Sequence, residues 1–187
     1  MTETEIKLAI PDPAAFKDRL RQLGWRVSVR RQEERNLVYD LPNQALFKSS
    51  RLLRLRQVGK RGWMTVKGPP QMGTAHKVRD EYEIETNQID ILSKMLETLG
   101  YELLWRYEKF RAVYKCDAES GLVFVDETPI GNFVELEGEA GWIDRMARKL
   151  GFGPSDYITA SYRELFAAYQ RQHPEIGRHM VFPKARP

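Results

Sequence analysis

The sequence predicts an α+β domain in which an antiparallel β-sheet closes into a barrel, with charged side chains in the lumen and helices packed outside. Two patterns predict this fold. In the first, charged and apolar residues alternate along the opening strand, where Glu3, Glu5 and Lys7 lie on one face and Ile6 and Leu8 on the other. In the second, amphipathic helices between the strands are available to cover the apolar faces. A closed sheet satisfies both patterns, because its charged faces meet inside and its apolar faces lie under the helices.

The alternation recurs along the chain, which makes an ordinary half-solvated sheet a poor explanation. For any single strand, one face in water and one in the core is the simpler interpretation. A solvated face, however, usually mixes Ser, Thr, Asn and Gln with charges, whereas these faces are almost wholly Glu, Lys and Arg. The further residues on the predicted charged face are Arg54, Arg56, Lys67, Lys77, Arg79, Glu81, Glu83, Glu85, Lys109, Arg111, Asp126, Glu135 and Glu137.

Turn and capping signals divide the chain into elements. Asp12-Pro13 begins a helix that Gly24 ends, and the capping box Ser161-x-x-Glu164 begins the last helix. The other predicted elements are an extended stretch over 25–40, a hairpin of 52–58 and 63–67, a strand over 76–86, a helix capped by Asn87, strands at about 101–115, 121–127 and 130–138, and a short helix around 143–150. We expect one domain over residues 1–171 and a flexible tail over 172–187, which is polar and contains prolines.

Composition limits the classes of protein. With 187 residues, of which 42% are hydrophobic, the chain can bury one good core. It has no apolar run of about 18 residues and no signal-peptide core, so we expect neither a membrane span nor secretion. Cys116 is the only cysteine, which fits a reducing cytoplasm.

Charge and histidine content disfavour two further classes. The formal charge is +4, but three basic residues less one acidic residue in the tail supply +2 of it, so the body is close to neutral. A nucleic-acid interface needs basic residues massed on one face; we therefore expect no nucleic-acid partner, while a homodimer stays open. His173 and His179 lie in the tail, which leaves His76 alone in the body. A zinc site or histidine-driven nucleophilic catalysis is therefore not expected.

The charge balance of the predicted lumen indicates its ligand. Eight acidic and eight basic residues share that face, so their formal charges cancel, and two divalent cations would raise the sum to +4. That charge complements a triphosphate chain. Carboxylate oxygens are the ligands that Mg²⁺ prefers, and arginine forks and lysines bind phosphate oxygens. The residues alone therefore predict a small triphosphate ligand together with Mg²⁺ or Mn²⁺.

The order of these motifs resembles that of the CYTH domain, the family of triphosphate tunnel metalloenzymes. Glu3-x-Glu5-x-Lys7 resembles the E-x-E-x-K signature of the family, and the resemblance extends over about residues 2–170. The motifs that follow in the family's order are Leu53-Arg54-Leu55-Arg56, Thr65-Val66-Lys67-Gly68-Pro69, Glu83-Ile84-Glu85, Lys109-x-Arg111, Asp126 and Glu135-Leu136-Glu137. The family includes class IV adenylyl cyclases, thiamine triphosphatases and inorganic triphosphatases. Its implied fold is an eight-stranded antiparallel tunnel.

The resemblance also implies a binding role for most lumen residues. The residues implied to hold the principal metal are Glu3, Glu5 and Glu137, with Glu135 and Asp126 near a second metal. The residues implied to bind the triphosphate are Lys7, Arg54, Arg56, Lys67, Arg79, Lys109 and Arg111. A tunnel carboxylate, Glu83 or Glu85, would be a ligand, a structural partner or a general base, and Lys7 is a further catalytic candidate. One departure concerns thiamine triphosphatases, which tend to have a stacking tryptophan where this chain has Leu52.

Three functions follow from these expectations. The first is a metal-dependent triphosphatase, in which the basic residues hold the chain in line and the metals neutralise the leaving oxygen and activate water. The second is a class IV adenylyl cyclase, in which the ribose 3′-OH attacks the α-phosphorus of ATP; no adenine pocket is visible in the sequence, so the fold alone supports it. The third is a non-catalytic binder of phosphorylated ligands, which would not need the metal carboxylates.

Overall fold

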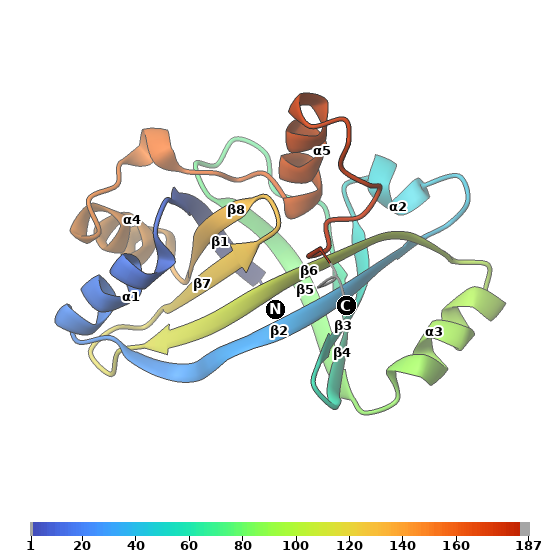
Figure 1. The fold of residues 1–187 in the computed structure, drawn as a ribbon, viewed down its shortest axis with the longest axis horizontal. Coiled ribbons are helices and arrows are strands. Elements are labelled where there is room, and N and C mark those ends of the chain that lie inside the picture. Colours follow the sequence, from blue (N-terminus) through green and yellow to red (C-terminus); the bar gives the residue numbers. More distant parts are fainter. Residues whose placement is uncertain (1, 184–187) are drawn as a thin grey trace.

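The computed structural model describes residues 2–183 and contains a closed antiparallel barrel of eight strands (Figure 1). Around the barrel the strand order is β1-β5-β4-β3-β2-β6-β7-β8. The strands are β1 (Thr2–Ile10), β2 (Arg26–Asp40), β3 (Leu52–Val58), β4 (Arg61–Lys67), β5 (Lys77–Thr86), β6 (Glu102–Lys115), β7 (Leu122–Thr128) and β8 (Gly131–Glu137). The α-helices are α1 (Pro13–Gln22), α2 (Ala45–Lys48), α3 (Ile89–Thr98), α4 (Ala140–Lys149) and α5 (Tyr162–Gln172). The predicted fold class is confirmed.

The barrel closes through a short pairing of its first strand. β1 pairs with β5 only from Thr2↔Asp80 to Glu5↔Lys77. Beyond this point the free edge of β1 pairs with Ile158, whose backbone exchanges two hydrogen bonds of 2.9 Å with Lys7. The segment that leads into α5 therefore completes the barrel wall where β1 and β5 separate.

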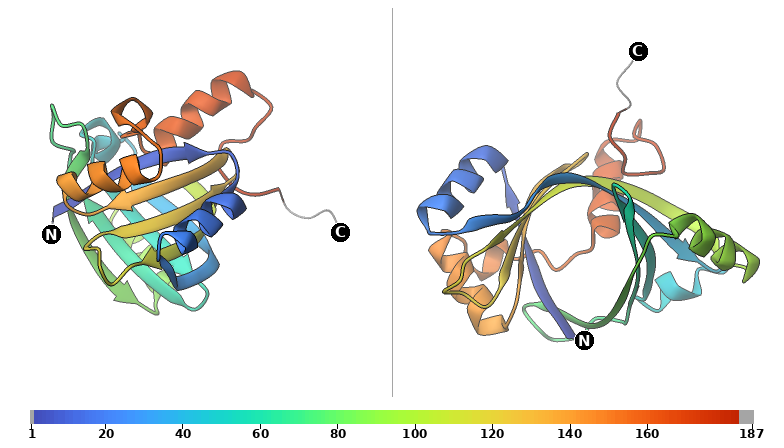
Figure 2. Two further views of the ribbon diagram at one scale, coloured as in Figure 1. Left: turned by 90° about the vertical axis from the view of Figure 1, so that its left-hand side faces the viewer. Right: turned by 90° about the horizontal axis from the view of Figure 1, so that it is seen from below.

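Helices pack against the outside of the barrel (Figure 2), where they cover most of its apolar side chains. Ile6 of β1 is fully buried in a cluster with Leu20 of α1 and Ile143 of α4. On another side, Leu55 of β3 packs with Leu96 of α3. This burial stabilises the fold by roughly 1.5–3 kcal/mol for each large side chain, and it makes the inward placement of charge possible.

One part of the outer surface is not covered in this way. On the outside of β4 and β5, Val66, Tyr82 and Ile84 are 39%, 65% and 61% exposed. The helices of the described chain thus cover most apolar strand faces but not this one. No helix within residues 2–183 is long and apolar enough to span a bilayer.

The C-terminal segment, which was predicted to be a flexible tail from Gln172 onward, makes defined contacts with β6. Met180 is fully buried, pairs in parallel with Tyr107 of β6, and donates its N–H to Arg106 O at 3.1 Å. Its carbonyl accepts the N–H of Glu108 at 2.8 Å. Apolar Ile176 and Met180 pack in one cluster with Trp105 and Tyr107 of β6, and Phe182 donates its N–H to the Glu108 carboxylate, so the segment contacts β6 through residue 182. Residues 184–187 of the predicted tail lie outside the described residues.

Two local predictions also differ from the structure. The helix predicted to be capped by Asn87 begins at Ile89, and its N-cap is Gln88. The Gln88 N–H donates to the Thr86 hydroxyl. The short helix α2 was not predicted. It exists because buried Asp40 accepts the N–H groups of Leu46 and Phe47, a long-range cap that no local pattern reveals.

Candidate active site

The barrel encloses a cavity of about 660 Å³, within the size range of small-molecule sites. Charged side chains from seven strands line it, and those of β1, β3, β4, β5, β6 and β8 lie on the face that the alternation predicts. The predicted site residues in the wall are Glu3, Glu5, Lys7, Arg54, Arg56, Lys67, Arg79, Glu83, Lys109, Arg111, Glu135 and Glu137. Asp126 is buried beside the cavity without lining it, and Glu85 lies elsewhere. The structure therefore brings most of the predicted set together around one space.

Basic residues hold the carboxylates of Glu3 and Glu5 in buried ion pairs. The pairs are Lys67–Glu3 at 2.7 Å, Arg79–Glu3 at 3.5 Å, Lys7–Glu5 at 3.1 Å and Lys77–Glu5 at 3.2 Å. Burial opposes ionisation of Lys7, but Glu5 and then Glu135 outweigh burial and raise the pKa of Lys7. Lys7 therefore stays protonated near neutral pH, so it supplies charge and cannot act as a general base.

Glu137 is partly buried among other carboxylates in the cavity wall. It lies opposite Glu5 across the β1–β8 pair, with Glu3 two residues along the same face. Burial, and then the charges of Glu3, Glu135 and Glu5, raise the pKa of Glu137 to about 7. The pKa of Glu3 is also raised, by burial and then by Glu5. Within the described chain no basic residue forms an ion pair with Glu137, so a positive charge is missing at this point.

This donor set fits a hard divalent cation by its chemistry. Three carboxylates on neighbouring strands supply the oxygen ligands that Mg²⁺ and Mn²⁺ favour, and their mutual repulsion would be relieved by a cation. Among residues 2–183, no group of three or more acidic, histidine or cysteine side chains is arranged so that it could hold a metal ion. The carboxylates of Glu3 and Glu5 are each engaged by basic partners.

Asp126 is the opposite case, because its carboxylate accepts several hydrogen bonds from protein donors. It is fully buried and accepts two 2.6 Å bonds from Arg111, one of 2.9 Å from Lys109 and one of 2.6 Å from the Tyr162 hydroxyl. Arg111 also forms a short ion pair with Glu135. Three of the bonds to Asp126 end on Oδ2 and one on Oδ1, so both oxygens are already engaged by the protein, and the predicted place of Asp126 near a second metal stays a prediction. Asp126 anchors β6, β7 and α5 to one another.

Glu83 and Glu85, predicted alike from their alternation, are placed differently. Glu83 lines the cavity, 2.8 Å from Arg56, and accepts the Thr65 hydroxyl at 2.6 Å. It therefore orients an arginine and has little freedom to act as a base. Glu85 is outside the cavity, half exposed, and forms a two-bond ion pair with Arg61. The prediction of Glu85 as a tunnel residue is wrong because β5 extends past the lumen with the β3–β4 hairpin.

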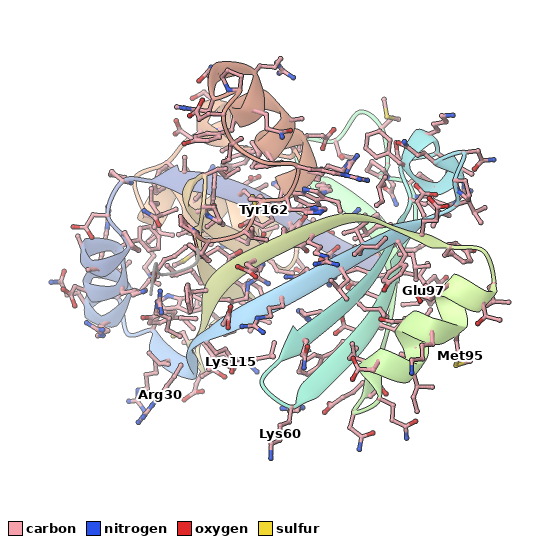
Figure 3. All side chains as sticks on the ribbon, turned by 45° about the vertical axis from the view of Figure 1, so that its right-hand side comes forward. Arg30, Lys60, Met95, Glu97, Lys115 and Tyr162 are labelled. Atoms are coloured by element: carbon pink, nitrogen blue, oxygen red, sulfur yellow. The ribbon has the colours of Figure 1, made fainter. Side chains whose placement is uncertain are left out.

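Sequence reasoning missed lumen residues on β2 and α5. Glu34 is 4% exposed, 3.6 Å from Lys109 and 4.0 Å from Arg56. It was missed because residues 32–36 of β2 are polar on both faces, so no alternation is visible. Tyr162 lies at the inner end of α5 in Figure 3, lines the cavity and donates its hydroxyl to Asp126.

A closed antiparallel barrel with a charged, ligand-sized lumen defines the tunnel class of proteins, in which the site is the interior of the sheet itself. Comparison with known families agrees. The CYTH domain matches residues 1–162, so the chain belongs to the CYTH domain family.

Alignments with similar proteins cover most of this chain. A Methanocaldococcus jannaschii protein whose name assigns it provisionally to the adenylate cyclases is 24% identical over 176 residues, covering 88% of this chain and 98% of that protein. A Vibrio parahaemolyticus structure with a provisional adenylate cyclase name is 20% identical, with a TM-score of 0.78 and coverage of 89% and 98%. A Hippeastrum structure described as a provisional adenylyl cyclase with dominant triphosphatase activity is also 20% identical, with a TM-score of 0.67 and coverage of 89% and 96%. At these identities the structural likenesses establish the fold.

Proposed function

We propose that this protein hydrolyses substrates that carry a triphosphate chain, with Mg²⁺ or Mn²⁺ as cofactor. The observation that carries the proposal is the division of the cavity wall into many basic side chains and one group of mutually repelling carboxylates. A polyanion that arrives with a divalent cation satisfies both halves. The CYTH family, and the triphosphatase activity stated for the Hippeastrum protein, support the same reaction class.

Substrate binding would exchange one set of ion pairs for another. Lys67 and Arg79 hold Glu3 in the free protein. Phosphate oxygens are better partners for them, because an arginine fork binds two oxygens and a lysine adds a point charge. When these side chains turn to phosphate, Glu3 is released. Arg54 and Arg56, oriented by Glu83, and Arg111, oriented by Asp126, extend the phosphate-binding wall.

Glu3, Glu5 and Glu137 would then hold the divalent cation. The cation supplies positive charge that stabilises the negative charge developing on the phosphate oxygens during transfer. Glu135 lines the cavity beside this group, and its ion pairs with Lys7 and Arg111 keep the basic wall next to the carboxylates.

The chain itself contributes positioning and charge to the reaction. Attack of water on the terminal phosphorus forms one P–O bond and breaks the bond to the bridging oxygen, giving orthophosphate and a diphosphate. Protonated Lys7 and the arginines stabilise charge on the transferred and leaving groups. Among the described lumen carboxylates, Glu83 and Asp126 are occupied by hydrogen bonds. The pKa of Glu137 is raised to about 7 by burial and by neighbouring carboxylates, and a cation on its carboxylate would lower that pKa again, so its proposed role is to hold the metal.

A second candidate reaction uses the same site. The provisional cyclase names of the Methanocaldococcus and Vibrio proteins favour attack of the ribose 3′-OH of ATP on the α-phosphorus, with release of pyrophosphate. Binding of the phosphate chain would be unchanged, and only the nucleophile and the bond broken differ.

Product analysis tests both reactions. Purified protein is incubated with tripolyphosphate, ATP or thiamine triphosphate, each with Mg²⁺, with Mn²⁺ or with a chelator. Orthophosphate and a diphosphate product are expected, with none in the chelator samples. Cyclic AMP and pyrophosphate from ATP would establish the cyclase reaction instead. Failure to convert any substrate with either metal would refute the proposed function.

A further inference from the structure

One mouth of the cavity differs from its charged interior. β2 ends, and β3 and β6 begin, at this mouth, and α2 and the start of α5 lie over it (Figure 1). Apolar side chains dominate its wall: Phe47 of α2, Leu52 of β3, and Leu104 and Trp105 of β6. An apolar wall does not contribute to phosphate binding, because phosphate oxygens need hydrogen-bond donors and positive charge.

Phe47 and Arg163 form a stacked pair at this mouth. The guanidinium carbon of Arg163 lies 4.8 Å from the centre of the Phe47 ring and 5.8 Å from that of Trp105. Trp105 is 3% exposed and stacks on Tyr107, so it is a fixed part of the wall. Phe47 is 47% exposed and lines the cavity. An aromatic ring and a guanidinium plane are thus both open to a ligand.

Hydrogen bonds to Asp40 hold the backbone at Phe47 in place. Asp40, 2% exposed, accepts the N–H groups of Leu46 at 3.0 Å and Phe47 at 2.8 Å. The two residues that flank α2, Gln44 and Ser50, have left-handed backbones with φ of 56° and 55°. Such conformations cost free energy in residues other than glycine and persist where the surrounding structure enforces them. Phe47 is therefore presented on a braced loop.

The charges at the mouth also differ from those of the interior. The basic residues that line the interior all have carboxylate partners, as the ion pairs of Lys67 and Arg111 illustrate. Arg51 and Arg163 line the mouth and have no ion pair within the described chain. Two unpaired guanidinium groups beside an exposed ring suit a planar, electron-rich ligand that is joined to an anion.

We propose that this mouth, built by Phe47 and Arg163, is a stacking site for the heterocycle of a nucleoside triphosphate. The inference rests on the proposed function, because the triphosphate would occupy the basic interior while the base stays at the mouth. Stacking on an aromatic ring and a guanidinium accepts any base. The substrate class is therefore nucleoside triphosphates as a group, in preference to inorganic tripolyphosphate.

The test compares three ligands in the unaltered protein and two variants. Dissociation constants of ATP, GTP and tripolyphosphate are measured by calorimetry for the unaltered protein, Phe47→Ala and Phe47→Trp. In Phe47→Ala, the ratio of the ATP constant to the tripolyphosphate constant should rise about tenfold, because one stacking contact is lost, and the GTP ratio should rise equally. Phe47→Trp keeps an aromatic plate and should restore both ratios.

Controls keep the two levels of the proposal separate. Leu99→Ala removes an apolar side chain that is 69% exposed at the C-terminal end of α3, away from the cavity, and should leave every ratio unchanged. Arg163→Lys keeps the charge but loses the plane, so it should raise the nucleotide ratios as well. An unchanged ATP ratio in Phe47→Ala would overturn the stacking site. Absence of turnover with all triphosphates would refute the hydrolase instead, and the binding ratios would still decide the stacking site.

Discussion

The lumen contains two ion clusters of opposite character. Around Asp126, each carboxylate oxygen accepts bonds from Lys109, Arg111 or Tyr162 at 2.6–2.9 Å, and the group is fully buried. Around Glu137, the neighbouring carboxylates repel one another, and the pKa of Glu137 rises to about 7. The first cluster is complete without a ligand. The second has no basic partner for Glu137 within the described chain, and we propose that a cation completes it. This difference would separate structural support from a binding site in a lumen where every strand carries charge.

The largest expected effect breaks the complete cluster. Asp126→Ala would leave Lys109 and Arg111 buried with fewer partners, and loss of one partner in such a network costs about 3–5 kcal/mol. Urea unfolding at pH 7 measures the loss. Glu127→Ala, on the adjacent residue, is the matched control: its pairs with Lys17 and Arg31 are partly exposed, so it should cost under about 1 kcal/mol. Equal losses in the two variants would mean that the Asp126 cluster is not a structural anchor.

The next effect concerns the incomplete cluster. Glu3→Ala removes one of the three carboxylates proposed to hold the divalent cation. Turnover of a triphosphate at saturating Mg²⁺ should fall at least about a hundredfold, while circular dichroism shows a retained fold. Glu97→Ala on the outer helix α3 (Figure 3) is the control. Turnover that is unaltered in Glu3→Ala would remove this residue from the metal site.

Alternation in the sequence was sufficient to predict the barrel and most of its lumen. A side chain on a strand has only two directions, so one buried apolar neighbour, such as Ile6, determines the direction of Glu5 and Lys7. The same rule fails where a strand leaves the barrel. Glu85 keeps the lumen parity of Glu83, but at the end of β5 that face meets solvent and Arg61.

Features set by distant contacts were beyond reach from the sequence. Glu34 sits in a stretch of β2 that is polar on both faces, and only its neighbours on β3 and β6 show which face is inside. One of the hydrogen bonds to Asp126 comes from the hydroxyl of Tyr162, 36 residues away. Docking of Met180 depends on a parallel pairing with β6. The sequence identifies which side chains are charged, but the groups that each one contacts determine whether it supports the fold or is available to a ligand.

A smaller effect follows from the pKa of Glu137. A carboxyl whose pKa is about 7 in the folded protein and 4.5 otherwise stabilises the fold fully below pH 4.5, and this contribution is lost as the pH rises through 7. Glu137→Gln should therefore stabilise the metal-free protein at pH 8 by on the order of 2 kcal/mol and change little at pH 4. Thermal unfolding at both pH values measures it. A variant less stable than the parent at pH 8 would show that Glu137 has an attractive partner and that the cluster is complete.

The smallest effect is expected at Glu85, which shares its strand face with Glu83 but not its surroundings. Glu85 and Arg61 are half or more exposed, and exposed pairs contribute little because water and salt screen them. Glu85→Gln should leave unfolding and triphosphate turnover unchanged within error. Glu83→Gln is the paired variant: it weakens the hold on Arg56 in the cavity wall and should raise the Michaelis constant for triphosphate several-fold. A Glu85→Gln variant with a similarly raised constant would place Glu85 in the site and contradict its position outside the lumen.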